Sequence, residues 1–272
     1  MRFYAVCVYL FLYIPIGVIA LFSFNAGRHA SQLQGFSTKW YGKALSNPFV
    51  IDALETSLIV AFCSALFASV FGTMAAVALQ GIRGPVKVAF DMLIYVAVMI
   101  PGIVIGIATL IGLVTVFNQL NPMIAAIWPA GFNPPKLRMG IGSLIAAHTM
   151  FLMALVAIIV RARLAGMDRT LNEASSDLYA TPLGTFRQVT LPLIFPAILA
   201  GFLLSFTFSF DDFIIAFFVA GSETTLPIYV FSSIRRGVTP EINAIGTMVM
   251  GVSLLLLISA QLLLKRERRK SR

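Results

Sequence analysis

The segment NEASSDLYATPLGTFRQVTLP (residues 172–192) interrupts a chain of 272 residues that is otherwise strongly apolar. Long apolar runs lie on either side of it, at 140–161 and 191–221. An α-helix needs about 20 apolar residues, at about 1.5 Å each, to cross the roughly 30 Å of hydrocarbon in a bilayer. The segment therefore connects two predicted transmembrane helices.

The composition of the whole chain indicates a polytopic membrane protein. Hydrophobic residues make up 59% of the sequence, charged residues make up 11%, and the mean hydropathy is +0.92. A soluble domain of this size could not bury that much apolar surface. The net charge of +9 could indicate nucleic acid binding in a soluble protein, but here Lys and Arg at the membrane edges explain it. We expect no nucleic acid partner.

We predict an all-α fold in which residues 1–272 form a single transmembrane domain. The first apolar run is interpreted as an uncleaved span, because no small-residue cleavage site follows it. Pro101 and Gly102 should kink the third span. Six spans are expected, near 4–24, 55–80, 88–117, 140–161, 191–221 and 241–264.

The distribution of Lys and Arg predicts the orientation. With both termini in the cytoplasm, the inner segments hold 13 of these residues and the outer segments hold 7. The positive-inside rule favours that arrangement, which makes the loop at 168–190 cytoplasmic. The inner set is Arg2, Arg83, Lys87, Arg161, Arg163, Arg169, Arg187, Lys265, Arg266, Arg268, Arg269, Lys270 and Arg272.

Capping signals predict a helix, a turn and a second helix within this loop. Thr170 and Glu173 have the spacing of a capping box. Thr181 is suited to cap the second helix, with Pro182 at its first position, and Thr190 is expected to open the following span in the same way. The apolar residues of the loop could pack on the bundle, which interfacial helices favour, or contact a soluble protein. These residues are Leu171, Ala174, Leu178, Leu183, Phe186 and Val189.

The stretch EASSDLYATPLGTFRQVTLP resembles the EAA loop of permease subunits in binding-protein-dependent ABC importers. The matching residues are Glu173, Ala174, Leu191 and Pro192, whereas Ser175 replaces an Ala and Tyr179 occupies the usual Gly position. If that position needs a positive φ, Tyr179 would be strained. YIPIGVIALFSFN (13–25), QGFSTKWY (34–41), LSFTFSFDDFIIAFFVAG (204–221) and GVTPEINAIGT (237–247) resemble the spermidine/putrescine branch of the family.

The resemblance implies a type I importer permease in which this loop is the coupling helix that docks on an ATPase subunit. It also implies partners: a second permease subunit, two ATPase subunits and an extracytoplasmic solute-binding protein, in the inner membrane of a bacterium. The coupling residues that it indicates are Glu173, Ala174, Ser175, Asp177, Leu178, Tyr179, Ala180, Thr181, Pro182, Leu183 and Gly184.

Asp211 and Asp212 form an acidic pair about two thirds of the way along the fifth predicted span. One charged residue near the bilayer centre costs roughly 2.5–3.5 kcal/mol on insertion scales, so both should face protein, water or a cation. With Phe208 and Thr207 about one turn back, they are candidates for a pathway that carries an ammonium group. The alternative, an interhelical polar cluster that fixes packing, is about as well supported. We expect one carboxylate to face the pathway and the other to pair with a neighbouring helix. His148 is expected to be a satisfied histidine of the bundle, and Asp91 an interfacial residue.

No catalytic or metal-binding pattern is present in the sequence. GIRGPVK (81–87) is too short for a phosphate-binding loop, and no cluster of His, Cys, Asp and Glu has metal-ligand spacing. We therefore expect no enzyme activity and no bound cofactor, with ATP and Mg²⁺ used by the partner ATPase. The predicted function is import of polyamines or a related small organic cation. The alternatives are another solute, such as an opine-like compound or a metal complex, and an ion-gradient-driven secondary transporter.

Overall fold

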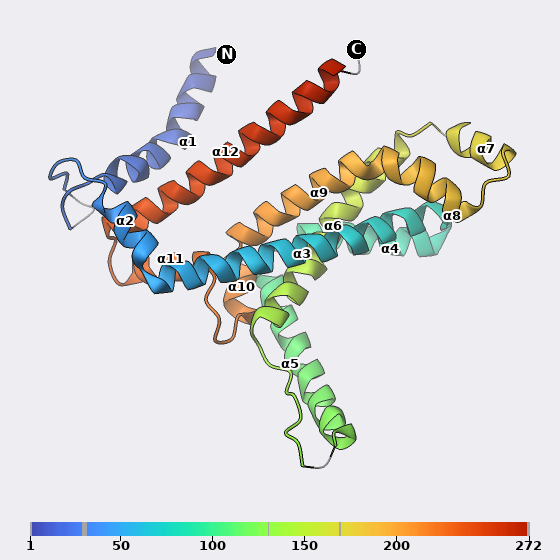
Figure 1. The fold of residues 1–272 in the computed structure, drawn as a ribbon, viewed down its shortest axis with the longest axis horizontal. Coiled ribbons are helices and arrows are strands. Elements are labelled where there is room, and N and C mark those ends of the chain that lie inside the picture. Colours follow the sequence, from blue (N-terminus) through green and yellow to red (C-terminus); the bar gives the residue numbers. More distant parts are fainter. Residues whose placement is uncertain (1, 29–31, 130, 169, 271–272) are drawn as a thin grey trace. The chain divides into compact units, whose positions relative to one another are not determined.

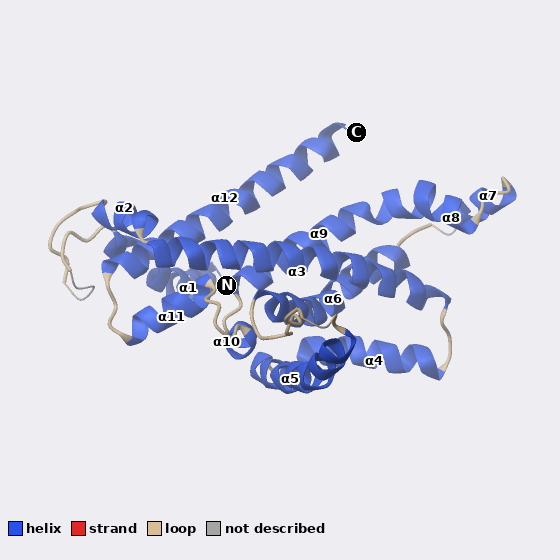
Figure 2. Cartoon of the chain, turned by 60° about the horizontal axis from the view of Figure 1, so that its bottom comes forward, coloured by secondary structure: helices blue, strands red, loops and turns tan. Residues whose placement is uncertain are grey.

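The computed structural model describes residues 2–28, 32–129, 131–168 and 170–270, with the side chains of Arg2, Asn172 and 256–270 left out. Arg169 and the basic side chains from Lys265 onward, which the orientation prediction counted, therefore lie outside the described residues. The described chain is almost entirely helical, which confirms the all-α class, and Figure 2 shows helices joined by loops. The helices in chain order, labelled in Figure 1, are α1 (Arg2–Ser23), α2 (Lys39–Ser46), α3 (Pro48–Gly81), α4 (Pro85–Met99), α5 (Gly102–Ile127), α6 (Ile141–Ala165), α7 (Thr170–Asp177), α8 (Pro182–Thr185), the π-helical turn η1 (Phe186–Thr190), α9 (Leu191–Asp211), α10 (Ile214–Val219), α11 (Leu226–Arg235) and α12 (Pro240–Lys270).

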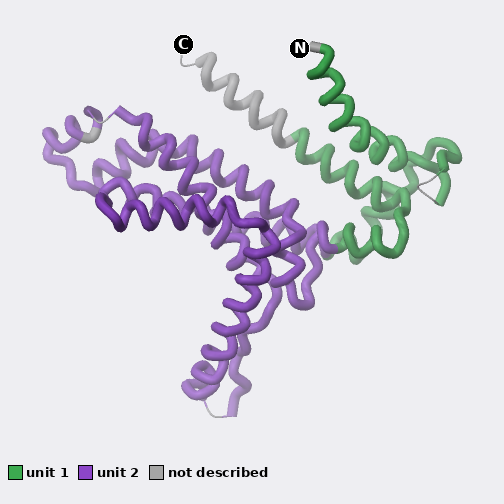
Figure 3. Tube along the Cα trace, turned by 180° about the vertical axis from the view of Figure 1, so that it is seen from behind, with its two compact units in different colours: residues 1–52, 229–272 green, residues 53–228 purple. Residues whose placement is uncertain are grey.

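The chain forms two compact units, residues 1–52 with 229–272 and residues 53–228, which Figure 3 colours separately. In the first unit, α1 and α2 both contact α12. The Nζ of Lys43 lies 3.0 Å from Oε2 of Glu241, and Asn47 Nδ2 donates to Oε1 of the same carboxylate at 3.0 Å. Polar contacts thus connect α2 and the chain that follows it to the start of α12.

The second unit is built around α6, which packs against α9, α4 and α10. Small residues allow the helices to approach closely: a Cβ added to Gly72 of α3 would lie 2.6 Å from the carbonyl oxygen of Met153. Gly201 of α9 likewise contacts Val156 of α6, which is fully buried. Helices in lipid associate through such packing rather than through exclusion of water. The tight core of this unit therefore fixes α3, α6 and α9 against one another.

Within the described residues, five helical segments are long and apolar enough to cross a membrane. The apolar part of α12 whose side chains are described, Pro240–Leu255, is shorter than a span, so the count of six spans stays a prediction. α4 has no buried residue, as expected for a helix in contact with lipid. The five segments are Phe3–Ser23, Pro48–Gly81, Gly102–Ile127, Ile141–Ala165 and Pro182–Asp211.

Two of the predicted spans are broken helices. The run at 88–117 was predicted as one kinked helix, but α4 ends at Met99 and α5 begins at Gly102. The cause is Pro101, because a residue before proline is forced out of the helical region, and Ile100 has a ψ of 134°. The run at 191–221 was also predicted as one helix, but α9 ends at Asp211 and α10 begins at Ile214.

The predicted start of the fifth span at Thr190 is wrong. Thr190 is helical, with φ −66° and ψ −52°, and its side chain makes no capping hydrogen bond. α8, η1 and α9 follow one another without interruption from Pro182 to Asp211. The π-helical turn, in which the amide of Leu191 donates to the carbonyl of Phe186, directly precedes Pro192. A widened turn relieves the clash between a proline ring and the carbonyl four residues earlier.

Candidate functional site

The α7–α8 loop begins with a cap that differs from the predicted one. Oδ1 of Asp168 accepts a hydrogen bond from the amide of Thr170 at 3.0 Å, and Thr170 is the first residue of α7. The capping box with Thr170 as its cap is therefore wrong, and Asp168 has that role. The hydrogen bonds from the amide and then the hydroxyl of Thr170 hold the pKa of Asp168 below its ordinary value.

Tyr179 lies just after the C-terminal end of α7, and its backbone is in the left-handed region, with a φ of 59°. Its amide donates to the carbonyl of Ser176 at 2.9 Å, and the amide of Ala180 donates to the carbonyl of Ser175 at 3.1 Å. This pair of hydrogen bonds is a Schellman motif, whose left-handed residue is usually glycine. No other described non-glycine residue has a positive φ. The turn therefore has the geometry that favours Gly, and Tyr179 carries the strain that the sequence led us to suspect.

The second helix of the loop starts as the sequence predicted. Thr181 is extended at φ −68° and ψ 153°, its hydroxyl accepts a hydrogen bond from the amide of Gly184, and Pro182 is the first helical residue. The hydroxyls of Ser175 and Thr185 lie 2.8 Å apart and connect α7 to α8. The strained turn is thus fixed from both sides.

The tip of this loop exposes large apolar side chains. Leu178 is 81% exposed, Tyr179 is 96% exposed and Leu183 is 75% exposed. The prediction that the apolar residues of the loop pack on the bundle is therefore wrong for Leu178 and Leu183. Phe186 and Val189, in contrast, are half-buried. Of the remaining predicted coupling residues, Ser175 and Gly184 are half-buried and Glu173, Ala174, Asp177, Ala180, Thr181 and Pro182 are exposed.

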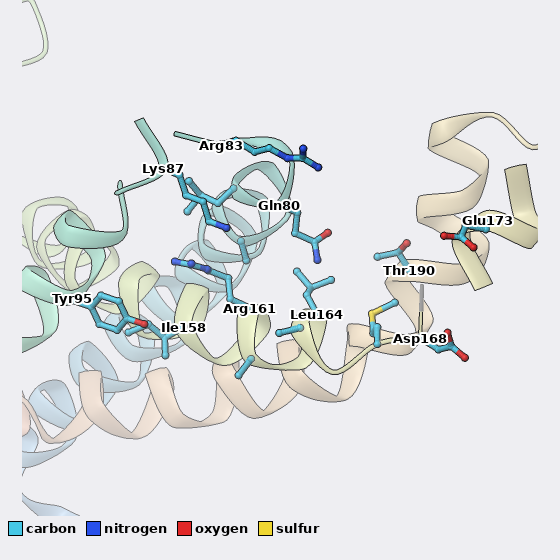
Figure 4. A pocket seen from close by; sticks show the side chains of 15 residues that line it. Gln80, Arg83, Lys87, Tyr95, Ile158, Arg161, Leu164, Asp168, Glu173 and Thr190 are labelled. Atoms are coloured by element: carbon cyan, nitrogen blue, oxygen red, sulfur yellow. The ribbon is translucent and has the colours of Figure 1, made fainter. Parts of the chain in front are cut away.

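A cavity of about 710 Å³ lies between α7 and the ends of α3, α4 and α6, shown in Figure 4. Glu173 and Asp168 line it on one side, and Arg83 and Lys87 line it on the other. A third cation, Arg161, also lines the cavity and pairs with Asp91 at 2.6 Å. Residues of opposite charge thus face one cavity beside the loop.

A second, smaller cavity of about 160 Å³ lies where both broken helices are interrupted. Ile100 and Gly102 line it from the break between α4 and α5, and Asp212 lines it from the break between α9 and α10. Discontinuous helices at membrane depth are tolerated where they line a cavity and are a frequent setting for solute sites. The other lining residues are Val98, His148, Phe151, Leu152, Phe208, Ser209 and Ile215.

Asp212 itself creates one of these breaks. Its Oδ2 accepts a hydrogen bond from the amide of Ala216 at 2.9 Å, which satisfies a donor at the start of α10. The same oxygen lies 3.4 Å from Nε2 of His148 on α6. Asp212 therefore pairs with a neighbouring helix and lines the cavity at the same time, two roles that the sequence analysis had divided between the two aspartates.

His148 is 2% exposed and satisfies only one of its nitrogens by hydrogen bonding. Nδ1 lies 2.6 Å from the hydroxyl oxygen of Ser209, but Nε2 has no hydrogen-bond partner among the described residues. The expected satisfied histidine is thus only half satisfied. Its partner Ser209 was missed because a serine in an apolar span has no sequence feature that distinguishes a site residue from a packing residue.

The four predicted pathway residues separate into two pairs. Phe208 and Asp212, four residues apart, line the cavity. Thr207 and Asp211 are exposed and do not line it, and the hydroxyl of Thr207 donates to the carbonyl of Leu203 in its own helix. Neighbouring positions on a helix differ by about 100°, so the two pairs face different directions. Their assignment to a solute pathway remains a prediction.

The sequence of this chain is similar to those of known transport proteins. Residues 68–270 match the family model described as the binding-protein-dependent transport system inner membrane component. The chain is 39% identical over 248 residues to the putrescine transport system permease protein PotI of Escherichia coli strain K12, with 89% of this chain and 82% of the relative aligned. It is 36% identical over 257 residues to the spermidine/putrescine transport system permease protein PotC of the same strain, with 94% and 90% aligned.

Among solved structures, the fold is similar to that of a chain in a bacterial ABC transporter involved in the import of the acidic polysaccharide alginate. The TM-score is 0.75, 96% of this chain and 92% of that chain are covered, and the sequence identity is 16%. At that identity, the similarity concerns the fold alone.

Proposed function

The chain belongs to the family of binding-protein-dependent transport system inner membrane components and is the permease subunit of an ABC importer, and we propose that this importer carries polyamines. Permeases of this kind are integral multi-pass proteins of the inner membrane and are not enzymes, since a separate subunit hydrolyses ATP. The names of the relatives with 36–39% identity support the solute class. ATP and Mg²⁺ are assigned to the ATPase subunits, and no cofactor to this chain.

The observation that carries the proposal is the carboxylate of Asp212 in an otherwise largely apolar cavity. Phe208 lies one turn away on α9 and lines the same cavity. A carboxylate attracts an ammonium group by charge, and an aromatic face adds cation–π attraction of about 0.5–2 kcal/mol. The methylene chain of a polyamine suits the apolar lining of Val98, Ile100 and Ile215.

Asp211 and Thr207 are assigned to a second stretch of the pathway, shared with the second permease subunit. Both are exposed on a face of α9 that does not line the cavity. A carboxylate on a membrane helix requires a polar surrounding, which a pathway between two permeases would supply. A polyamine has more than one ammonium group, so two acidic positions could be used in succession.

The α7–α8 loop is assigned as the coupling element, with both termini in the cytoplasm. Leu178 and Tyr179, which precede the apolar segment Pro182–Asp211, form an exposed apolar tip together with Leu183 at the start of that segment, which suits docking into a groove of an ATPase subunit. The partners in this scheme are a second permease, two ATPase subunits and an extracytoplasmic solute-binding protein. Closure of the ATPase subunits would move α7, and through α8 and η1 the continuous helix α9, which ends at Asp211 directly before Asp212.

Reconstitution tests this function. The tagged chain is purified with its partner subunits, placed in proteoliposomes with the binding protein, and assayed for uptake of putrescine and spermidine with and without ATP. Butane-1,4-diol, which has the length of putrescine without its charge, is the matched control. ATP-dependent uptake of both polyamines and none of the diol is expected. Polyamine uptake driven by an ion gradient without ATP, or uptake of the diol at an equal rate, would overturn the proposal.

A further inference from the structure

His148 lies on the Asp212 cavity with one ring nitrogen fixed and the other facing the carboxylate. Nδ1 is 2.6 Å from the Ser209 hydroxyl oxygen, and Nε2 is 3.4 Å from Oδ2 of Asp212. Nε2 is buried and has no hydrogen-bond partner among the described residues. A buried polar atom that borders a cavity and has no partner costs about 1–3 kcal/mol, which indicates a function for it.

The contacts of His148 favour a hydrogen on Nε2. If Nδ1 alone carried the proton, the lone pair of Nε2 would face the negative oxygen of Asp212, which is repulsive. With a hydrogen on Nε2, the ring presents an N–H to Asp212, and the Ser209 hydroxyl can donate to or accept from Nδ1. The ring therefore offers a donor to the carboxylate.

We propose that His148 is a positioning residue for solute recognition, whose Nε2 donor orients Asp212 toward the cavity, where the carboxylate can meet a solute ammonium group. This inference rests on the proposed transport of cations. Oδ2 of Asp212 accepts a hydrogen bond from the amide of Ala216, and Nε2 of His148 lies 3.4 Å from the same oxygen, close enough to orient the carboxylate by electrostatic attraction. A carboxylate whose orientation is fixed before the solute arrives loses less conformational entropy on binding.

Asp212 is the one carboxylate among the described residues that line this cavity. Lys87 and Asp91 of α4 and Asp211 of α9, which belong to helices packed against α6, do not line it. The donor on His148 therefore acts on a single acceptor.

The test measures putrescine uptake by the complete reconstituted complex at neutral pH. Each variant is compared with wild type at saturating loaded binding protein, and copurification of the partner subunits is measured beside uptake. His148→Gln keeps an N–H donor near the position of Nε2, so it should retain uptake. His148→Leu has no donor and should lower uptake about tenfold although the complex still assembles.

Two further variants, together with the Gln and Leu pair, separate a role in positioning from a role in packing. Ser209→Ala removes the hydrogen bond that fixes the ring, so it should lower uptake, but less than His148→Leu does. His29→Gln changes the other histidine of the chain and should leave uptake unchanged. If His148 only filled space, His148→Leu would retain at least as much uptake as His148→Gln.

The outcomes distinguish this inference from the proposed function. Absence of polyamine uptake by wild type, with ATP hydrolysis intact, overturns the proposed function and the inference with it. Normal wild-type uptake together with an equal loss in His148→Gln and His148→Leu, or with full uptake in His148→Leu, overturns the inference alone.

Discussion

The α7–α8 loop and the Asp212 cavity hold their polar groups by contacts of different range. In the loop, the hydroxyl contact between Ser175 and Thr185 connects residues 10 apart in the sequence. In the cavity, the contact between His148 and Ser209 connects residues 61 apart. Tyr179 of the loop is 96% exposed, whereas His148 of the cavity is 2% exposed. The loop is a local structure with an exposed tip, and the cavity is a tertiary structure formed where separate helices pack together.

Each of the two regions contains one energetically unfavourable feature that its surroundings hold in place. The loop keeps a strained residue, Tyr179, because neighbouring hydrogen bonds determine the turn whatever its side chain. The cavity keeps an unpaired Nε2 on His148, because packing of α6 against α9 determines the position of the ring. The strained turn of the loop leaves the Tyr179 side chain exposed to a partner protein. The unpaired Nε2 in the cavity offers an N–H donor to the Asp212 carboxylate.

The largest effect is expected at Asp212. Asp212→Asn should lower polyamine uptake about a hundredfold, because an ammonium group of the solute would lose its carboxylate partner. Loss of one member of a buried charged pair costs about 2–5 kcal/mol. Asp211→Asn is the matched control, since Asp211 is exposed and does not line the cavity, and it should have a much smaller effect. Uptake by the two variants in proteoliposomes provides the measurement. An equal loss in both would show that the cavity is not the main cation site.

A smaller effect is expected at the apolar tip of the loop. Leu178→Asp places a charge on an 81% exposed apolar side chain and should reduce copurification of the ATPase subunit about tenfold, as for a moderate interface residue. The same change at Leu33, which is also exposed, should leave copurification unchanged. Loss of membrane insertion in Leu178→Asp, rather than loss of the ATPase, would contradict a docking role.

Tyr179 allows strain and docking to be separated with two variants. Tyr179→Gly removes the ring and the left-handed strain, whereas Tyr179→Ala removes the ring but keeps the Cβ. The glycine variant should stabilise the turn by about 1 kcal/mol, seen as slower hydrogen exchange of the Ala180 amide. Both variants should weaken ATPase binding equally. Stronger binding by the glycine variant would show that strain, not the ring, governs the contact.

The smallest effect concerns Asp168 and pH. The pKa of Asp168 is lowered in the folded loop, chiefly by the amide of Thr170, so its contribution to helix stability is present above the ordinary carboxyl pKa. That contribution is lost as pH falls through the lowered value, below about pH 4. Hydrogen exchange at the start of α7 should therefore be constant from neutral to mildly acidic pH and should rise only in strong acid. Asp168→Asn should remove this dependence, and a dependence that persists in the variant would assign it elsewhere.

Local features of the fold were predictable where neighbouring residues decide them. The Thr181 cap and the first-turn Pro182 follow from the chemistry of adjacent residues and were confirmed. The cap of α7 was predicted wrongly, because Asp168 and Thr170 are both acceptable acceptors and lie two residues apart. Apolar patterning also gave no warning of the break before Ile214, since the residues on either side of the acidic pair are as apolar as the span itself.

The sequence by itself determined the membrane class, the all-α fold and the place of the polar loop, and its family resemblance indicated Tyr179 as a position of conditional strain. Each of these depends on hydropathy or on contacts between residues near one another in the chain. Only the tertiary structure brought His148, Ser209 and Asp212 to one cavity and separated Asp212 from Asp211. Those relations arise when α6 packs against α9, because helices in lipid choose their partners by close packing and shape, which patterning along one chain does not specify.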